Sequence, residues 1–225
     1  MREQFQEELD GVSATLVQMS GLVKIAMENA TTALLTADLQ LAEKVIAEDS
    51  IIDDMQHELD ARTINLIARQ GPVASDLRTL VTSLRMSADL ERMGDLAHHI
   101  SKSARMRYPA TAVPPELALT IEDMGRVCVK IIEKVALVLQ NRDAERALEV
   151  EKDDDEIDAL HRKIIQTLLD PKWTHGVETA IDMTLLGRYY ERCADHAVSI
   201  ARRVYFLVTG TVSYTHLTLP TNREV

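Results

Sequence analysis

Four pairs of carboxylates with the same four-residue spacing are the side chains in this sequence best suited to chemistry. Glu91 and Asp95 recur almost one hundred residues later as Glu191 and Asp195. Two residues four apart on a helix lie on one face, about one turn from each other. Each pair could therefore hold a cation from two sides. The remaining pairs are Asp49 with Asp53 and Asp154 with Asp158.

Clusters of carboxylate oxygens suit hard or borderline cations such as iron, manganese or magnesium. If the second and third helices of each half pack antiparallel, their pairs meet and could bridge more than one ion. The alternative is a solvated acidic face, whose repulsion Arg92 and Arg192 would offset. Helical wheels place the carboxylates beside the apolar seams, so we expect them at or near the surface.

The histidines and cysteines add little to this site. His98 follows Asp95 by three residues, a step found in buried di-iron bundles, but the second copy has Val198 there, which argues against His98 as a ligand. Cys128 and Cys193 show no metal-finger spacing, and each falls on an apolar seam. Free thiols in a chain without a signal-like start predict a reducing cytoplasm.

Composition excludes several classes of function. A net charge of -11 repels phosphate backbones, so nucleic acid is not expected as a partner. No apolar run approaches the roughly 20 residues of a membrane span, so any membrane contact must go through a protein partner. The sequence contains no glycine-rich phosphate loop and no nucleophile motif, which predicts a protein that is not an enzyme.

The elements that would position the acids are helices. From Phe5 the apolar residues recur in steps of four and three, which predicts a helix over residues 2–36. Asp38 can cap a second helix that ends at Gly71. A third helix opens near Asp76 and continues to about residue 107.

The same pattern then repeats. The proline-rich segment 108–115 predicts a linker. After it, the apolar seam returns at an offset of 105, which falls to 100 for the third helix, so the second copy is five residues shorter. We expect that shortening in the turn at residues 170–176. The fold prediction is all-α, with two tandem three-helix bundles over residues 1–107 and 116–209.

Residues 210–225 break the helical period and are rich in β-branched side chains. This segment is similar to an in-frame translation of a sequencing adaptor. We interpret it as a non-native-looking tail and leave it out of the fold prediction.

Three motifs make the chain resemble the PhoU family. They are the duplicated Glu-Arg-x-x-Asp, the Gly-Pro-Val-Ala-x-Asp-Leu-Arg stretch at residues 71–78, and the Ile-Asp steps at residues 52 and 157. The resemblance covers residues 1 to about 209 and implies two three-helix bundles. The second half departs from the pattern at residues 171–178, which argues against equal metal occupancy of the two halves.

The resemblance also implies a function. PhoU proteins are cytoplasmic negative regulators of phosphate uptake and of the phosphate-starvation response, and act with the phosphate ABC transporter ATPase and its sensor histidine kinase. Some bind iron or zinc clusters through motifs that match all four carboxylate pairs here. A homodimer is the family expectation. The alternative hypothesis from the residues is a di-metal carboxylate enzyme or a metal-storage bundle.

Overall fold

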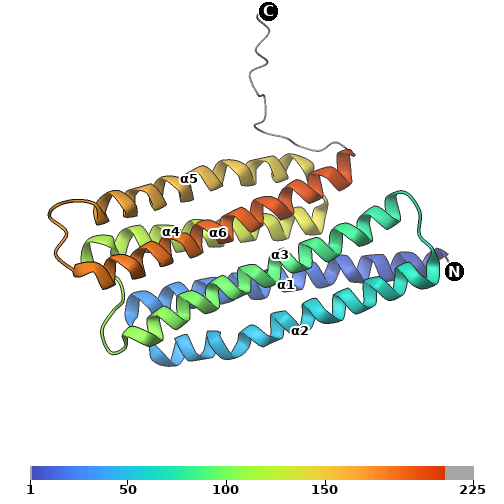
Figure 1. The fold of residues 1–225 in the computed structure, drawn as a ribbon. Helices are drawn as coiled ribbons and strands as arrows, with labels where there is room; N and C mark the ends of the chain where they lie inside the picture. Colours follow the sequence, from blue (N-terminus) through green and yellow to red (C-terminus); the bar gives the residue numbers. More distant parts are fainter. Residues whose placement is uncertain (1, 211–225) are drawn as a thin grey trace, which may run out of the picture.

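The computed structural model describes residues 2–210, which form six α-helices and no strand. The first half contains α1 (Arg2–Thr36), α2 (Leu39–Gln70) and α3 (Ser75–Arg107), and the second contains α4 (Pro115–Asn141), α5 (Ala144–Leu168) and α6 (Gly176–Thr209). Figure 1 shows each half as a layer of three long, roughly aligned helices. The predicted all-α fold with an internal repeat is confirmed. Beyond Gly210, the predicted tail lies outside the described residues.

The described helices also bear on membrane contact. None of them combines the length and the apolar character that a membrane span requires.

The first turn of each half is built in the same way. Asp38 and Asp143 cap α2 and α5, each accepting a backbone N–H hydrogen bond at 3.0 Å. The residues before them, Ala37 and Arg142, both take a left-handed backbone conformation, with φ of 52° and 51°. This conformation lets the chain reverse within two residues and place the capping carboxylate at the next helix. The predicted cap at Asp38 is confirmed.

The second turn differs between the halves, and here the prediction was wrong. The five-residue deficit lies in the helix and not in the turn, because α5 has 25 residues where α2 has 32. Helix α2 runs on to Gly71, which takes the left-handed conformation that ends a helix (φ 53°). Pro171 ends α5 earlier, since proline disfavours helix in the residue before it. The turn at residues 169–175 is the longer one.

The two halves share one continuous apolar core. Helix α1 packs on α2, α3 and α4, while α6 packs on α3, α4 and α5. The α1–α4 crossing is close, since a Cβ on Gly125 would lie 2.5 Å from Cγ2 of Thr31. At the same place the hydroxyls of Thr31 and Tyr190 are hydrogen-bonded at 2.9 Å. The halves are therefore joined by a packed interior.

A buried carboxylate also joins the halves across the α3–α6 contact. Asp89 of α3 accepts hydrogen bonds from Ser199 (3.1 Å) and Arg203 (3.2 Å) of α6, and lies 3.0 Å from Nδ1 of His196. Burial works to raise the pKa of Asp89, but the His196 hydrogen bond and the Arg203 charge outweigh it and hold that pKa below its ordinary value. His196 therefore serves the interface and does not join Asp195.

Candidate metal centre

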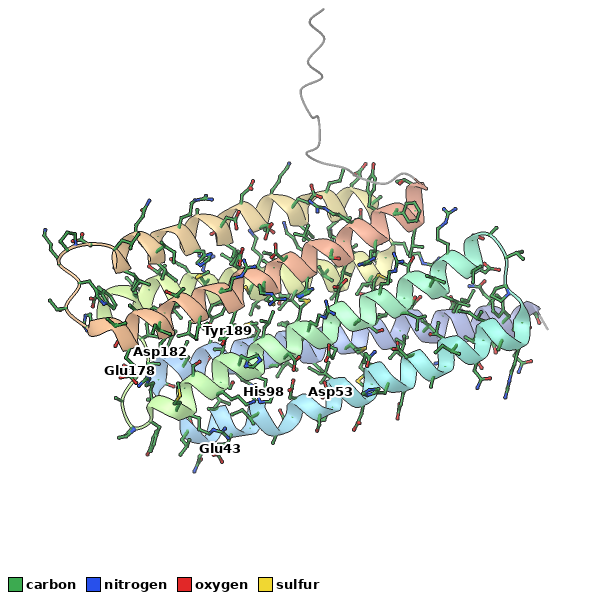
Figure 2. The ribbon with its side chains drawn as sticks, viewed as in Figure 1. Glu43, Asp53, His98, Glu178, Asp182 and Tyr189 are labelled. Atoms are coloured by element: carbon green, nitrogen blue, oxygen red, sulfur yellow. The ribbon has the colours of Figure 1, made fainter. Side chains whose placement is uncertain are left out.

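Helices α2 and α3 bring three potential metal ligands together in the first half. Asp49 of α2 and Asp95 and His98 of α3 each offer one ligand atom, and these atoms lie within 4.8 Å of one another. The two helices run antiparallel after the Gly71 turn, so the acidic pair of one faces that of the other. In Figure 2, His98 and Asp53 lie between α3 and α2, which run side by side. The predicted meeting of the two pairs occurs.

His98 is oriented by a carboxylate. Its Nδ1 contacts Oδ2 of Asp49, and the two side chains are 20% and 10% exposed. Its other ring nitrogen, Nε2, is buried and has no hydrogen-bond partner among the described residues. The contact between Nδ1 and Asp49 places the imidazole and the carboxylate close enough to share one ion. The imidazole therefore fits the role of ligand.

The acids of the first half repel one another. Burial raises the pKa of Asp53, and the charges of Asp49 and Asp95 raise it further. Burial also raises the pKa of Glu91, together with the charges of Asp95 and the α2 acids, and Arg92 offsets this only in part. Four carboxylates in one electrostatic group make deprotonation costly. A bound cation would remove that cost.

This donor set fits a borderline cation. Carboxylate oxygens alone favour magnesium, calcium or manganese, whereas an added imidazole favours iron or zinc. Asp49, Asp95 and His98 would hold the ion, with Asp53 and Glu91 beside it. The ion would supply positive charge between α2 and α3, so the site could fix the two helices against each other.

In the second half the corresponding acids also repel one another, but no histidine joins them. Burial raises the pKa of Asp154 to about 6, and the charges of Asp195 and Asp158 raise it as well. Oδ1 of Asp154 is buried without a hydrogen-bond partner among the described residues. Val198 stands where the first half has His98. Within the described part of the chain, no group of three close ligands forms here.

Arginines interact with the acids of this second group. Arg188 forms an ion pair with Glu191, which takes that carboxylate away from the other acids. Arg202 lowers the pKa of Asp154 in part and pairs with Glu151 at 2.6 Å. The equivalent first-half residues are Ala88 and Lys102. The second group is thus partly neutralised by the chain itself.

One expectation about these residues needs correction. The acids were expected at or near the surface, which is wrong for Asp49, because α3 covers it and leaves only 10% of the side chain exposed. The sequence argued against His98 as a ligand because Val198 replaces it; the structure places His98 against Asp49, and its role as a ligand stays a prediction. The Asp95-x-x-His98 step was the signal that could have found it.

Comparison with known proteins identifies the fold and the repeat. The PhoU domain matches twice, over residues 16–104 and 121–204. The chain belongs to the PhoU family. A relative from Mycobacterium tuberculosis, named phosphate-specific transport system accessory protein PhoU homolog 2, is 46% identical over 93% of this chain and 99% of its own length. PhoU homolog 1 of Mycobacterium leprae is 45% identical over 94% and 95%.

Solved PhoU structures show the same architecture. PhoU from Pseudomonas aeruginosa superimposes with a TM-score of 0.83 at 29% identity, covering 92% of this chain and 100% of that one. The phosphate transport system regulatory protein PhoU from Streptococcus pneumoniae gives 0.82 at 25% identity, with coverage of 93% and 99%. The predicted PhoU resemblance is confirmed. Metal binding by the eight acids stays a prediction.

Proposed function

We propose that this PhoU-family protein is an accessory regulator of phosphate-specific transport. It would act in the cytoplasm as a negative regulator of phosphate uptake and of the phosphate-starvation response. The observation that carries the proposal is the 46% identity, over 93% of the chain, to a protein named as an accessory protein of that transport system. The finer role is that of an adaptor between the transporter ATPase and the sensor histidine kinase.

Matched exposed apolar side chains support a role in binding proteins. Leu77 and Val177 occupy equivalent positions at the start of α3 and α6 and are 38% and 76% exposed. Val81 and Ile181, one turn further on, are 39% and 54% exposed. Exposed apolar side chains grouped on one helix face are typical of protein contact surfaces. Two related surfaces suit a protein that touches two partners or a second copy of itself.

The first-half centre would regulate this binding as a cation site. Iron or zinc is the expected occupant, with manganese or magnesium as alternatives. Occupancy would neutralise the acids around Asp49 and hold α2 and α3 in one arrangement. No turnover is required for such a role, because a change in stability or in surface charge is enough to alter partner affinity.

A capture experiment tests the proposal. The full chain is tagged and recovered from native cell membranes at high and low phosphate, alongside an Asp49→Asn/Asp95→Asn variant. We expect the wild type to retain the transporter ATPase or the sensor kinase, and the variant to retain less. A Glu58→Gln variant controls for loss of charge, since Glu58 is an exposed acid of α2 outside the cluster. Absence of both partners at both phosphate levels would overturn the adaptor role.

A second candidate function is a di-metal carboxylate enzyme or a metal store. The observation that favours it is the close group of Asp49, Asp95 and His98, with two further acids beside it. Di-iron bundles use the carboxylate-x-x-His step on two helices, and Val198 supplies no second histidine here. Metal-dependent oxidase or hydrolase activity that is lost in Glu91→Gln would favour this function over the regulator.

A further inference from the structure

An apolar pocket opens beside Asp49, next to the candidate metal centre. It lies between α1 and α2 and has a volume of about 290 Å³. Leu22 and Ile25 of α1 form one wall, and Ile51 and Ile52 of α2 form the other. Ile25 and Ile51 are 49% and 47% exposed, so apolar surface lines the mouth of the pocket. Glu48 and Asp49 add carboxylates to its lining.

The second half has charged side chains at the same place. Lys130 stands where the first half has Ile25, and it pairs with Asp153 at 2.9 Å. Lys134, one turn further along α4, pairs with the same carboxylate at 2.8 Å. Asp153 is the counterpart of Glu48. Two lysines of α4 are thus tied to α5, whereas the first half leaves an apolar opening between α1 and α2.

A glycine extends the pocket to the carboxylate. Gly94 of α3 lies in the pocket lining, and a Cβ placed on it would come within 3.0 Å of Cδ1 of Ile52 and 3.5 Å of Oδ1 of Asp49. The second half has Ala194 at this position. The missing methyl group therefore leaves space between the apolar wall and Asp49.

The pocket has a net negative charge. Its ionisable lining residues are Lys44, Glu48 and Asp49. Lys44 and Glu48 approach each other at 3.9 Å, so their charges largely cancel. What remains is Asp49, whose Oδ2 contacts His98 while its Oδ1 lies on the Gly94 side. An apolar wall that leads to a carboxylate is complementary to a molecule with an apolar body and a cationic end.

We infer that this pocket binds a small amphipathic ammonium, a primary amine with an aliphatic body of about six carbons. The alkyl chain lies between the isoleucines, and the ammonium group donates hydrogen bonds to Asp49. Because the same carboxylate belongs to the candidate metal centre, amine and metal exclude each other. The pocket thus gives the first half a second input that the second half lacks.

Binding of n-hexylammonium to the full chain, dialysed against a chelator so that Asp49 is free, tests this inference. Isoleucine methyl NMR signals are followed during titration, and we expect shifts at Ile51 and Ile52 with a Kd of about 1 mM, as befits seven non-hydrogen atoms. Hexanol should bind at least about tenfold more weakly, because it lacks the charge. Hexanoate should produce no shift.

Variants that copy the second half separate the pocket from non-specific binding. Ile25→Lys should weaken hexylammonium binding by about tenfold or more, and Gly94→Ala should weaken it by several-fold. Ile64→Lys, the same change at an exposed isoleucine elsewhere on the surface, should leave it unaltered. Equal affinity for hexanol, equal loss in Ile64→Lys, or no shift with hexylammonium up to 50-fold excess over the expected Kd would each overturn the inference.

Discussion

The two halves of this PhoU-family protein carry the same acids at the same spacing but differ in what surrounds them. In the first half, no lysine or arginine in the described part of the chain forms an ion pair with Asp49, Asp53, Glu91 or Asp95. In the second half, Arg188 pairs with Glu191 and Arg202 acts on Asp154. Both groups keep uncompensated charge, since Arg92 offsets only part of it in the first and Arg202 only part of it in the second. The difference is that the first group includes His98, whereas the second has one acid held in an ion pair. Equal spacing therefore does not make equal sites.

The largest difference should appear in metal affinity. Asp49→Asn should lower the affinity of the full chain for zinc or manganese by about 100-fold, since a ligand is worth at least as much as the outer-sphere partners that cost about 10–100-fold. Asp154→Asn should change it by no more than about twofold. Calorimetric titration measures both. Comparable losses in the two variants would mean that the two halves bind metal equally, which would contradict a difference between the two sites.

A smaller effect should follow from giving the second half the features of the first. Val198→His with Arg188→Ala supplies the missing imidazole and releases Glu191. We expect a second zinc-binding event, weaker than the first by about tenfold because Asp195 remains exposed. Stoichiometry from the same titration gives the answer, with Arg188→Ala alone as the control. If stoichiometry stays at the wild-type value, the arginines and Val198 are not what separates the halves.

The smallest effect concerns stability without metal. Asp154 has its pKa raised from 3.8 to about 6, so the folded protein holds this proton more tightly than the unfolded chain. That stabilisation is complete below pH 3.8 and is lost as the pH rises through about 6. Asp154→Asn should therefore raise the free energy of unfolding at pH 8, relative to its effect at pH 4, by roughly 1–2 kcal/mol after allowance for solvent screening.

Urea unfolding at the two pH values measures this difference. Glu58→Gln serves as the control because Glu58 is an exposed acid. A gain for Asp154→Asn that is the same at pH 4 and pH 8 would show that burial and the neighbouring acids do not raise the pKa of Asp154.

The helices and their first turns could be predicted from the sequence because the signals are local. The apolar steps of α1, the Asp38 cap and the left-handed Gly71 each act within one or two turns. The early end of α5 was missed because the repeat offset cannot distinguish a shorter helix from a shorter turn. Pro171 indicates the earlier end of α5, but the prediction assigned it only to the turn.

The site was harder to predict because it depends on two helices at once. A helical wheel places Asp49 beside its own seam but says nothing of α3, which covers it. The same limit applies to His98, whose partner lies 49 residues away along the chain. The internal repeat was also a poor guide to His98. The second half has Val198 at that position, but the residues that surround His98 occur only in the first half.

The single core that runs through both halves has a thermodynamic consequence. Helices α1 and α4 are in such close contact at Thr31 and Gly125 that neither half has a complete interior without the other. The duplication therefore forms one cooperative folding unit, and unfolding should occur in a single transition. The second half, where no group of three close ligands forms among the described residues, still packs against the first half and completes its interior. One copy can therefore lose the chemistry of the site and still be retained, because the other copy needs it to fold.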